Sequence, residues 1–230
     1  MTDGLVGCLL GVLLGMRHAV EPDHLAAVTT LNLRARSPWR GMLLGAWWGL
    51  GHALALLGLG GVLVVMQTRL RPGQTALLEG LVGVMLVALG IAAVRRAWTE
   101  GTMGPVQRHS HGKTPHAHAT TGAHLHVGRL TLSQQPLLIG FAHGLAGSGA
   151  LTALVLSSLP TVAGQLLYIL MFGAGAALGM ALLSGALGLP LSRSARRPQL
   201  HRRLSLCAGA LSVVLGVYWT ANAYALIHAL

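Results

Sequence analysis

The sequence predicts an all-α integral membrane protein with six transmembrane helices, arranged as two inverted three-helix repeats. Three observations lead to this fold class. Of the 230 residues, 53% are hydrophobic and 9% are charged, whereas a soluble domain carries about 25% charged residues. Six apolar runs reach the length of roughly 20 residues that a helix needs to cross a bilayer. The two halves of the chain also resemble each other in sequence.

The six apolar runs are each expected to form one transmembrane helix, at residues 5–31, 42–66, 76–97, 135–158, 162–187 and 205–228. Thirteen of the 16 Lys and Arg residues lie in the connections after the first, third and fifth runs, and two lie between the second and third. Because Lys and Arg concentrate in cytoplasmic loops, we expect a multi-pass protein of the cell membrane with both termini outside and the loop inside. The net charge of +11 then belongs to these loops, and nucleic-acid binding is not expected.

An internal repeat relates the two halves of the chain at an offset of 124 or 125 residues. It divides the chain into a first three-helix repeat (1–97), a His-rich cytoplasmic loop (98–134) and a second three-helix repeat (135–230). Three spans in each half force the halves into opposite orientations, as in many secondary transporters. The matching segments are Gly15-x-x-His18 with Gly140-x-x-His143, and Trp48-Gly49-x-Gly51 with Phe172-Gly173-x-Gly175.

Ionisable residues interrupt the first apolar run, where Arg17 to His24 reads RHAVEPDH. Charged groups inside a membrane span are costly, so their default interpretation is functional. On a straight helix, His18, Asp23 and His24 would point in different directions. Pro22 cannot donate to the His18 carbonyl, and its ring clashes with that carbonyl, so the helix is expected to break here. The break is expected to let the three side chains converge on one ion and to free the His18 carbonyl as a further ligand.

The ligand types in this motif indicate a borderline transition metal. Two imidazoles and a carboxylate suit Ni²⁺, Co²⁺, Zn²⁺ or Fe²⁺ better than Ca²⁺ or Mg²⁺, and the absence of sulfur ligands argues against Cu⁺. His52 lies in the middle of the second run, where it could be a fourth ligand, a partner of the ligands or a hydrogen-bonded packing residue. The predicted metal residues are His18, Asp23, His24 and His52.

Three further residues could take part in the site. Glu21 could offset part of the charge of a bound ion. His143 occupies the repeat position of His18, and it could be a ligand or a gate. Ser148 belongs to the segment Gly147-Ser148-Gly149, which stands where the first half carries its acid and is expected to be breakable.

The loop between the two repeats carries three His-x-His pairs in a segment rich in Gly, Thr and Ala. Such a composition cannot bury a core, so the loop is expected to be mobile and to capture metal loosely. The histidines concerned are His109, His111, His116, His118, His124 and His126.

These motifs resemble those of the nickel/cobalt transporter family. His18-x4-Asp23-His24 is similar to the family's His-x4-Asp-His signature, and Leu50-Gly51-His52 is similar to its second Gly-His element. Glu21-Pro22 and Gly144-Leu145-Ala146-Gly147-Ser148 resemble the urease-accessory-like membrane branch. The resemblance implies that His18, Asp23 and His24 are required for metal uptake, and it suggests a nickel-enzyme maturation or metallochaperone partner. Pro22 replaces a small residue of the larger group, and related His-rich members are exporters, so direction and metal preference stay open.

The leading hypothesis is therefore a secondary transporter of Ni²⁺ or Co²⁺, in which the ion is substrate and no catalytic cofactor is needed. The alternatives are a metal exporter and a membrane protein that binds haem through His18, His52 and His143. An enzyme is not expected, because no His-Glu-x-x-His motif is present. The chain also lacks an ATP-binding P-loop, so any pumping must use a gradient or a partner.

Overall fold

The computed structural model describes residues 2–33, 35, 37–99, 109–110, 115–116, 124–127, 130–194 and 197–229. Helices dominate this part of the chain: α1 (Thr2–His18), α2 (Pro22–Asn32), α3 (Pro38–Ala55), the π-helical turn η1 (Leu56–Gly60), α4 (Gly61–Val65), α5 (Pro72–Thr99), α6 (Gln135–Ser158), α7 (Val162–Ser194) and α8 (Pro198–His228). Two short antiparallel hairpins lie between α5 and α6, formed by β1 (His109–Ser110) with β2 (Pro115–His116) and β3 (His124–Val127) with β4 (Leu130–Ser133).

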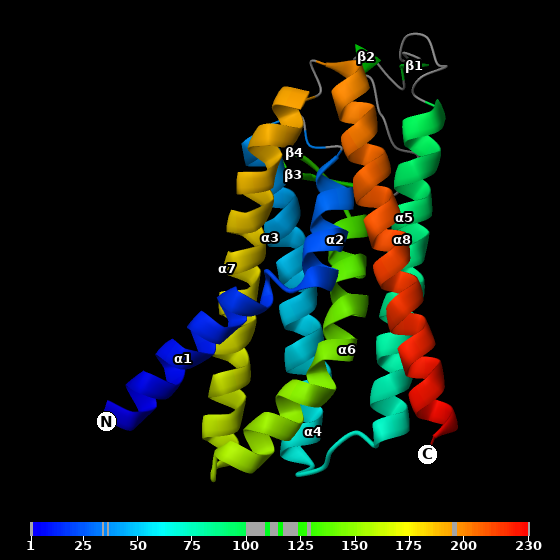
Figure 1. The fold of residues 1–230 in the computed structure, drawn as a ribbon. Helices are drawn as coiled ribbons and strands as arrows, with labels where there is room; N and C mark the ends of the chain where they lie inside the picture. Colours follow the sequence, from blue (N-terminus) through cyan, green and yellow to red (C-terminus); the bar gives the residue numbers. More distant parts are fainter. Residues whose placement is uncertain are drawn as a thin grey trace.

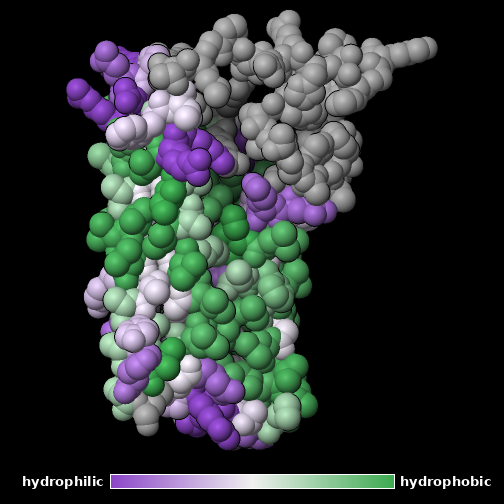
Figure 2. Space-filling view, turned by 90° about the vertical axis from the view of Figure 1, so that its right-hand side faces the viewer, coloured by the Kyte–Doolittle hydropathy of each residue, from purple (hydrophilic) through white to green (hydrophobic). Residues whose placement is uncertain are grey.

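The helical membrane class is confirmed, because five helical segments are long and apolar enough to cross a bilayer. They are Pro38–Val65, which joins α3, η1 and α4, and the single helices α5, α6, α7 and α8. Figure 2 shows an apolar surface over the middle of the helices, with hydrophilic residues gathered toward the two ends. The first predicted span differs from the others, since it consists of two shorter helices, α1 and α2.

The helix is interrupted between α1 and α2, as Pro22 predicts. The helix α1 ends at His18, and Pro22 opens α2, where its missing N–H costs nothing because first-turn N–H groups have no helical partner. Figure 1 shows α1 leaning away from the bundle while α2 continues within it. The expected free carbonyl at His18 is wrong, because the backbone N–H of Glu21 donates to it at 3.1 Å. A tight turn at residues 19–21 uses this acceptor.

Glycine allows the long helices to approach each other closely. A Cβ atom added to Gly49 on α3 would lie 2.6 Å from the Ala177 Cα on α7, and one added to Gly90 on α5 would lie 2.5 Å from the Gly209 carbonyl on α8. Small residues at membrane helix interfaces permit this contact. The main packed pairs are α3 with α7, α5 with α8, α1 with α7 and α3 with α6.

Several of these close contacts occur in reciprocal pairs. A Cβ atom on Gly15 would meet the Phe172 carbonyl, and one on Gly140 would meet the Trp48 carbonyl. Gly15 corresponds to Gly140 in the sequence repeat, and Trp48 corresponds to Phe172. The same contact is therefore made twice, once by each half of the chain on the other.

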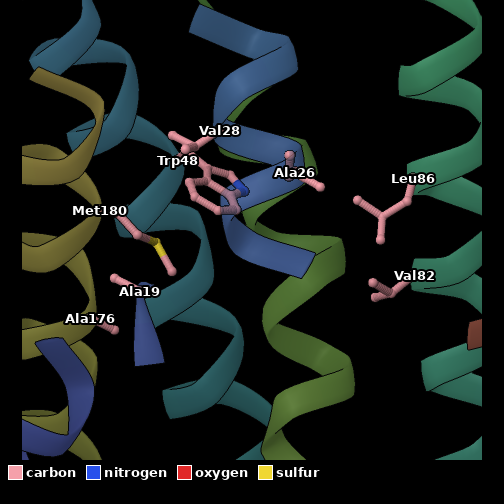
Figure 3. Packing of buried hydrophobic residues seen from close by; sticks show 9 residues of the cluster. Ala19, Ala26, Val28, Trp48, Val82, Leu86, Ala176 and Met180 are labelled. Carbon is pink, nitrogen blue, oxygen red and sulfur yellow. The ribbon is translucent and has the colours of Figure 1, made fainter. Parts of the chain in front are cut away.

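The short helix α2 is held in the centre of the bundle by apolar packing and one polar contact. Ala26, Ala27 and Val28 belong to a buried cluster with Trp48 of α3 and Met180 of α7 (Figure 3). At the end of α2, the Asn32 side chain donates from Nδ2 to the Ser184 carbonyl of α7 at 2.8 Å. Since Asn32 is completely buried, this bond fixes α2 against α7.

Candidate metal site

Four histidines from four helices meet inside the bundle. His18 ends α1, His24 lies in the first turn of α2, His52 lies near the end of α3, and His143 lies on α6. The imidazole centroids are 4.3 Å apart for His18 and His24, 5.0 Å for His24 and His52, 5.3 Å for His18 and His52, and 4.2 Å for His24 and His143. His24 and His52 are 0% exposed and His143 is 3% exposed. We call these four residues the histidine cluster.

Local features of the chain bring these rings together. The break at residues 19–21 turns the chain so that His18 and His24, six positions apart, face each other. On α6, Gly144 packs against the backbone of His52, where an added Cβ would lie 3.0 Å from its Cα. This close approach sets His143 beside the ring of His52, with centroids 6.0 Å apart. The π-helical turn η1 follows His52 after three residues, and such bulges are frequent at functional sites.

Two carboxylates contact the histidine cluster from α2 and the preceding turn. The Asp23 Oδ2 atom lies 2.8 Å from Nε2 of His143, and the Glu21 Oε2 atom lies 2.9 Å from Nδ1 of His18. The Glu21 side chain is 52% exposed, whereas that of Asp23 is 17% exposed. A proton on Nδ1 of His18, next to Glu21, would leave the lone pair of His18 on Nε2, which faces the cluster. Carboxylate–histidine pairs of this kind orient imidazole ligands in metal sites.

Six imidazole nitrogens of the cluster are buried and have no hydrogen-bond partner among the described residues: His18 Nε2, His24 Nδ1, His24 Nε2, His52 Nδ1, His52 Nε2 and His143 Nδ1. A buried polar atom without a partner costs about 1–3 kcal/mol. Such a concentration of unpaired donors and acceptors in one place fits a site that binds a ligand of its own. Two groups of three residues could each hold a metal ion. The potential ligand atoms of His18, His24 and His52 all lie within 4.8 Å of one another, and so do those of Asp23, His24 and His143.

The structure therefore separates the residues of the predicted site into two overlapping groups. His18, His24 and His52 lie together, whereas Asp23 lies with His24 and His143 and bonds to the latter. Asp23 and His143 are 120 positions apart, so their pairing requires the contact between the two halves.

The expected break on α6 is wrong. The helix runs without interruption from Gln135 to Ser158. The Ser148 hydroxyl donates to the Leu145 carbonyl at 2.6 Å, and Thr152 donates to the Ser148 carbonyl at the same distance. Because this segment contains no proline, the helical hydrogen bonds continue through it.

Four of the loop histidines belong to the strands of the two hairpins. His109 of β1 pairs with His116 of β2, and β3 contains His124 and His126. His111 and His118 lie outside the described residues.

Two residues that line the cluster were not predicted from the sequence to do so. Trp48 is completely buried, and its ring centroid lies 5.4 Å from that of His24 and 5.8 Å from that of His143, so it forms an apolar wall of the cluster. A Cβ atom on Gly147 would lie 3.9 Å from Nε2 of His18 and 4.0 Å from Cε1 of His52, so this glycine keeps the space beside them open. A tryptophan and a glycine in apolar helices carry no signal of this role by themselves.

Comparison with known proteins agrees with the chemistry of the cluster. Residues 5–221 match the NicO family, described as high-affinity nickel-transport protein. The chain is 36% identical over 213 residues to the urease accessory protein UreH of Bacillus sp. (strain TB-90), an alignment that covers 93% of this chain and 90% of that protein. No solved structure matches the chain. With its apolar helices and its buried histidines, this chain belongs to the NicO family of nickel-transport proteins and is a multi-pass membrane transporter rather than an enzyme.

Proposed function

We propose that this protein is a secondary transporter that carries Ni²⁺ across the cell membrane and binds it at the histidine cluster. The observation that carries the proposal is the group of six buried, unpaired imidazole nitrogens contributed by four helices. Neutral imidazoles are good ligands for nickel and cobalt. Co²⁺ is proposed as a second substrate on the same ligand chemistry.

The charges around the cluster support a divalent cation as the ligand. A dication inside a bilayer is strongly disfavoured unless opposite charge accompanies it. Asp23 contacts His143 and Glu21 contacts His18. The two carboxylates together offset the +2 charge of a bound ion. Arg17 is the cation nearest to them in sequence, and it belongs to the last turn of α1.

The cluster does not favour haem. A haem plane would have to lie between two imidazoles that ligate it from opposite faces. The rings of the cluster are instead packed on each other, with centroids 4.2–5.3 Å apart for the pairs that include His24 or His18. Side chains of the cluster itself occupy the space that the macrocycle would need.

We further propose that residues 1–97 and 135–230 form two inverted three-helix repeats around the cluster. The reciprocal contacts of Gly15 with Phe172 and of Gly140 with Trp48 support this arrangement. So does the packing, since α1 packs on α7 as α6 packs on α3, and α5 packs on α8. An inverted repeat with a site at its centre allows alternating access from the two sides.

In the proposed topology, both termini lie outside and the connections rich in arginine lie in the cytoplasm. Both chain ends lie toward the lower end of the bundle in Figure 1, and the α2–α3 and α7–α8 connections lie at the upper end. The helix ends that flank these connections carry Arg40, Arg193, Arg202 and Arg203, which supports a cytoplasmic upper end. The histidines of the 98–134 loop would then capture or sense metal in the cytoplasm. The urease accessory name of the Bacillus relative supports a link to nickel-enzyme maturation.

The test is flux of radiolabelled Ni²⁺ into and out of proteoliposomes that contain the purified protein. His24→Ala should abolish flux at all metal concentrations, because His24 belongs to both groups of ligands. His228→Ala is the matched control, since His228 is an exposed histidine on α8 that hydrogen-bonds to Tyr224 within its own helix. Normal flux in His24→Ala, or equal loss in both variants, would contradict the assignment. Accumulation of Ni²⁺ against its own gradient, in vesicles in which the orientation of the protein is known, separates import from export.

A further inference from the structure

The histidine cluster holds two sets of metal ligands rather than one. The first set is His18, His24 and His52, and the second set is Asp23, His24 and His143. We propose that these are two alternative positions of one transported ion, which passes from one to the other while His24 stays bound. This inference rests on the proposed nickel transport and adds a second position to its path.

The geometry places His24 between the two sets. Its ring centroid lies 4.3 Å from that of His18 on one side and 4.2 Å from that of His143 on the other. Both nitrogens of His24 are buried and unpaired, so neither is committed to a protein partner. An ion leaving one set can therefore keep one ligand until it reaches the other, which avoids a bare dication in a medium of low dielectric constant.

Each set also contains one side chain that is partly exposed and two that are buried. In the first set, the His18 side chain is 16% exposed, and His24 and His52 are completely buried. In the second set, the Asp23 side chain is 17% exposed, and His143 is 3% exposed. These two partly exposed side chains lie on either side of the turn at residues 19–21. The two positions therefore differ in which partly exposed side chain they include.

The two positions differ in chemical character. The first offers three imidazoles, whereas the second offers two imidazoles and a carboxylate. In the second position Asp23 and His143 are joined through Oδ2 and Nε2, and Nδ1 of His143 is left unpaired. Filling both positions together is disfavoured, because two dications would share one imidazole and repel each other.

The experiment compares binding and flux in variants that remove one position only. Equilibrium dialysis of Ni²⁺ uses the full chain in detergent with its six loop histidines replaced by serine, so that only the cluster binds metal; it gives the stoichiometry, and X-ray absorption gives the number of imidazoles on the bound ion. This loop-substituted chain should bind one Ni²⁺, and the variants below are made in it. His143→Gln should still bind one Ni²⁺, with three imidazoles, yet lose flux by at least about 10-fold in proteoliposomes. His52→Ala should bind one Ni²⁺ with two imidazoles and lose flux as well.

The variant His143→Gln is chosen because its amide can still donate to Asp23, so that the Asp23 contact and the fold are retained. Three results would overturn the inference: two Ni²⁺ per loop-substituted chain, undiminished flux in His143→Gln, or loss of Ni²⁺ binding in His143→Gln when its elution and melting in detergent match those of the chain without this substitution. Failure of wild-type protein to bind or move Ni²⁺ would instead reject the proposed function itself.

Discussion

Glu21 offers a quantitative test of how the proposed site is organised, because within the histidine cluster it contacts His18, a proposed ligand. Its carboxylate lies 2.9 Å from Nδ1 of His18 and is positioned to fix the ring with Nε2 toward the cluster. Removing a carboxylate that orients an imidazole ligand typically lowers metal affinity by about 10- to 100-fold. The Glu21 side chain is 52% exposed, so solvent weakens the purely electrostatic part of its effect.

We therefore expect the two substitutions at this position to differ. Glu21→Gln keeps an oxygen that can accept the Nδ1 proton, and it should weaken Ni²⁺ binding by at most about 10-fold, or about 1.4 kcal/mol. Glu21→Ala removes the acceptor and the charge, and it should weaken binding by more, toward 100-fold. The dissociation constant is measured by competition with a chelator of known nickel affinity, using purified protein in detergent.

Glu79→Gln is the matched control, because Glu79 is a carboxylate on α5 that contributes no atom to either group of ligands. Its affinity for Ni²⁺ should equal that of wild type. The reasoning is refuted if Glu21→Ala binds Ni²⁺ as tightly as wild type, since His18 would then need no orienting partner. Equal weakening in Glu79→Gln would show that net charge, rather than the contact with His18, is responsible.

Four further predictions follow from the sequence and the packing. Asp23→Asn keeps the shape but removes the anion, and it should nearly abolish nickel flux with normal membrane insertion; wild-type flux would show that the charge is not needed. Gly140→Ala places a methyl group against the Trp48 carbonyl. It should reduce the free energy of unfolding by about 1–3 kcal/mol and so lower the melting temperature in detergent. Gly58→Ala, whose added methyl group would meet nothing within 4 Å, should leave the melting temperature unchanged. Deletion of residues 109–126 should reduce uptake only at scarce metal, and loss of flux at every concentration would reverse the roles of loop and core. Gly112→Cys, with Cys8 and Cys207 replaced, should resist labelling from outside intact cells, and ready labelling would invert the topology.

The membrane class and the break in the first span were predictable because both depend on local chemistry. Hydropathy over some 20 residues reports whether a helix can lie in lipid, and five of the expected spans are long helices. A proline interrupts the backbone hydrogen bonds of a helix wherever it occurs, and α2 accordingly begins at Pro22. The presence of ionisable residues in an apolar run was likewise enough to predict His18, His24 and His52 as metal residues. The structure brings these three side chains together.

The partners of these residues were decided by the tertiary structure. Asp23 bonds to His143 of the second half and belongs to a different group of potential ligands from His18, since the packing of α6 against α3 places His143 there. The His18 carbonyl is used by the turn at Glu21, and α6 continues through Ser148 because nothing in that segment removes a backbone donor. Sequence by itself determined which residues are chemically capable of holding a metal ion, because that capacity belongs to side chains and their neighbours. Which of them face each other, and that they form two overlapping sets around His24, depends on helix contacts between residues more than 100 positions apart.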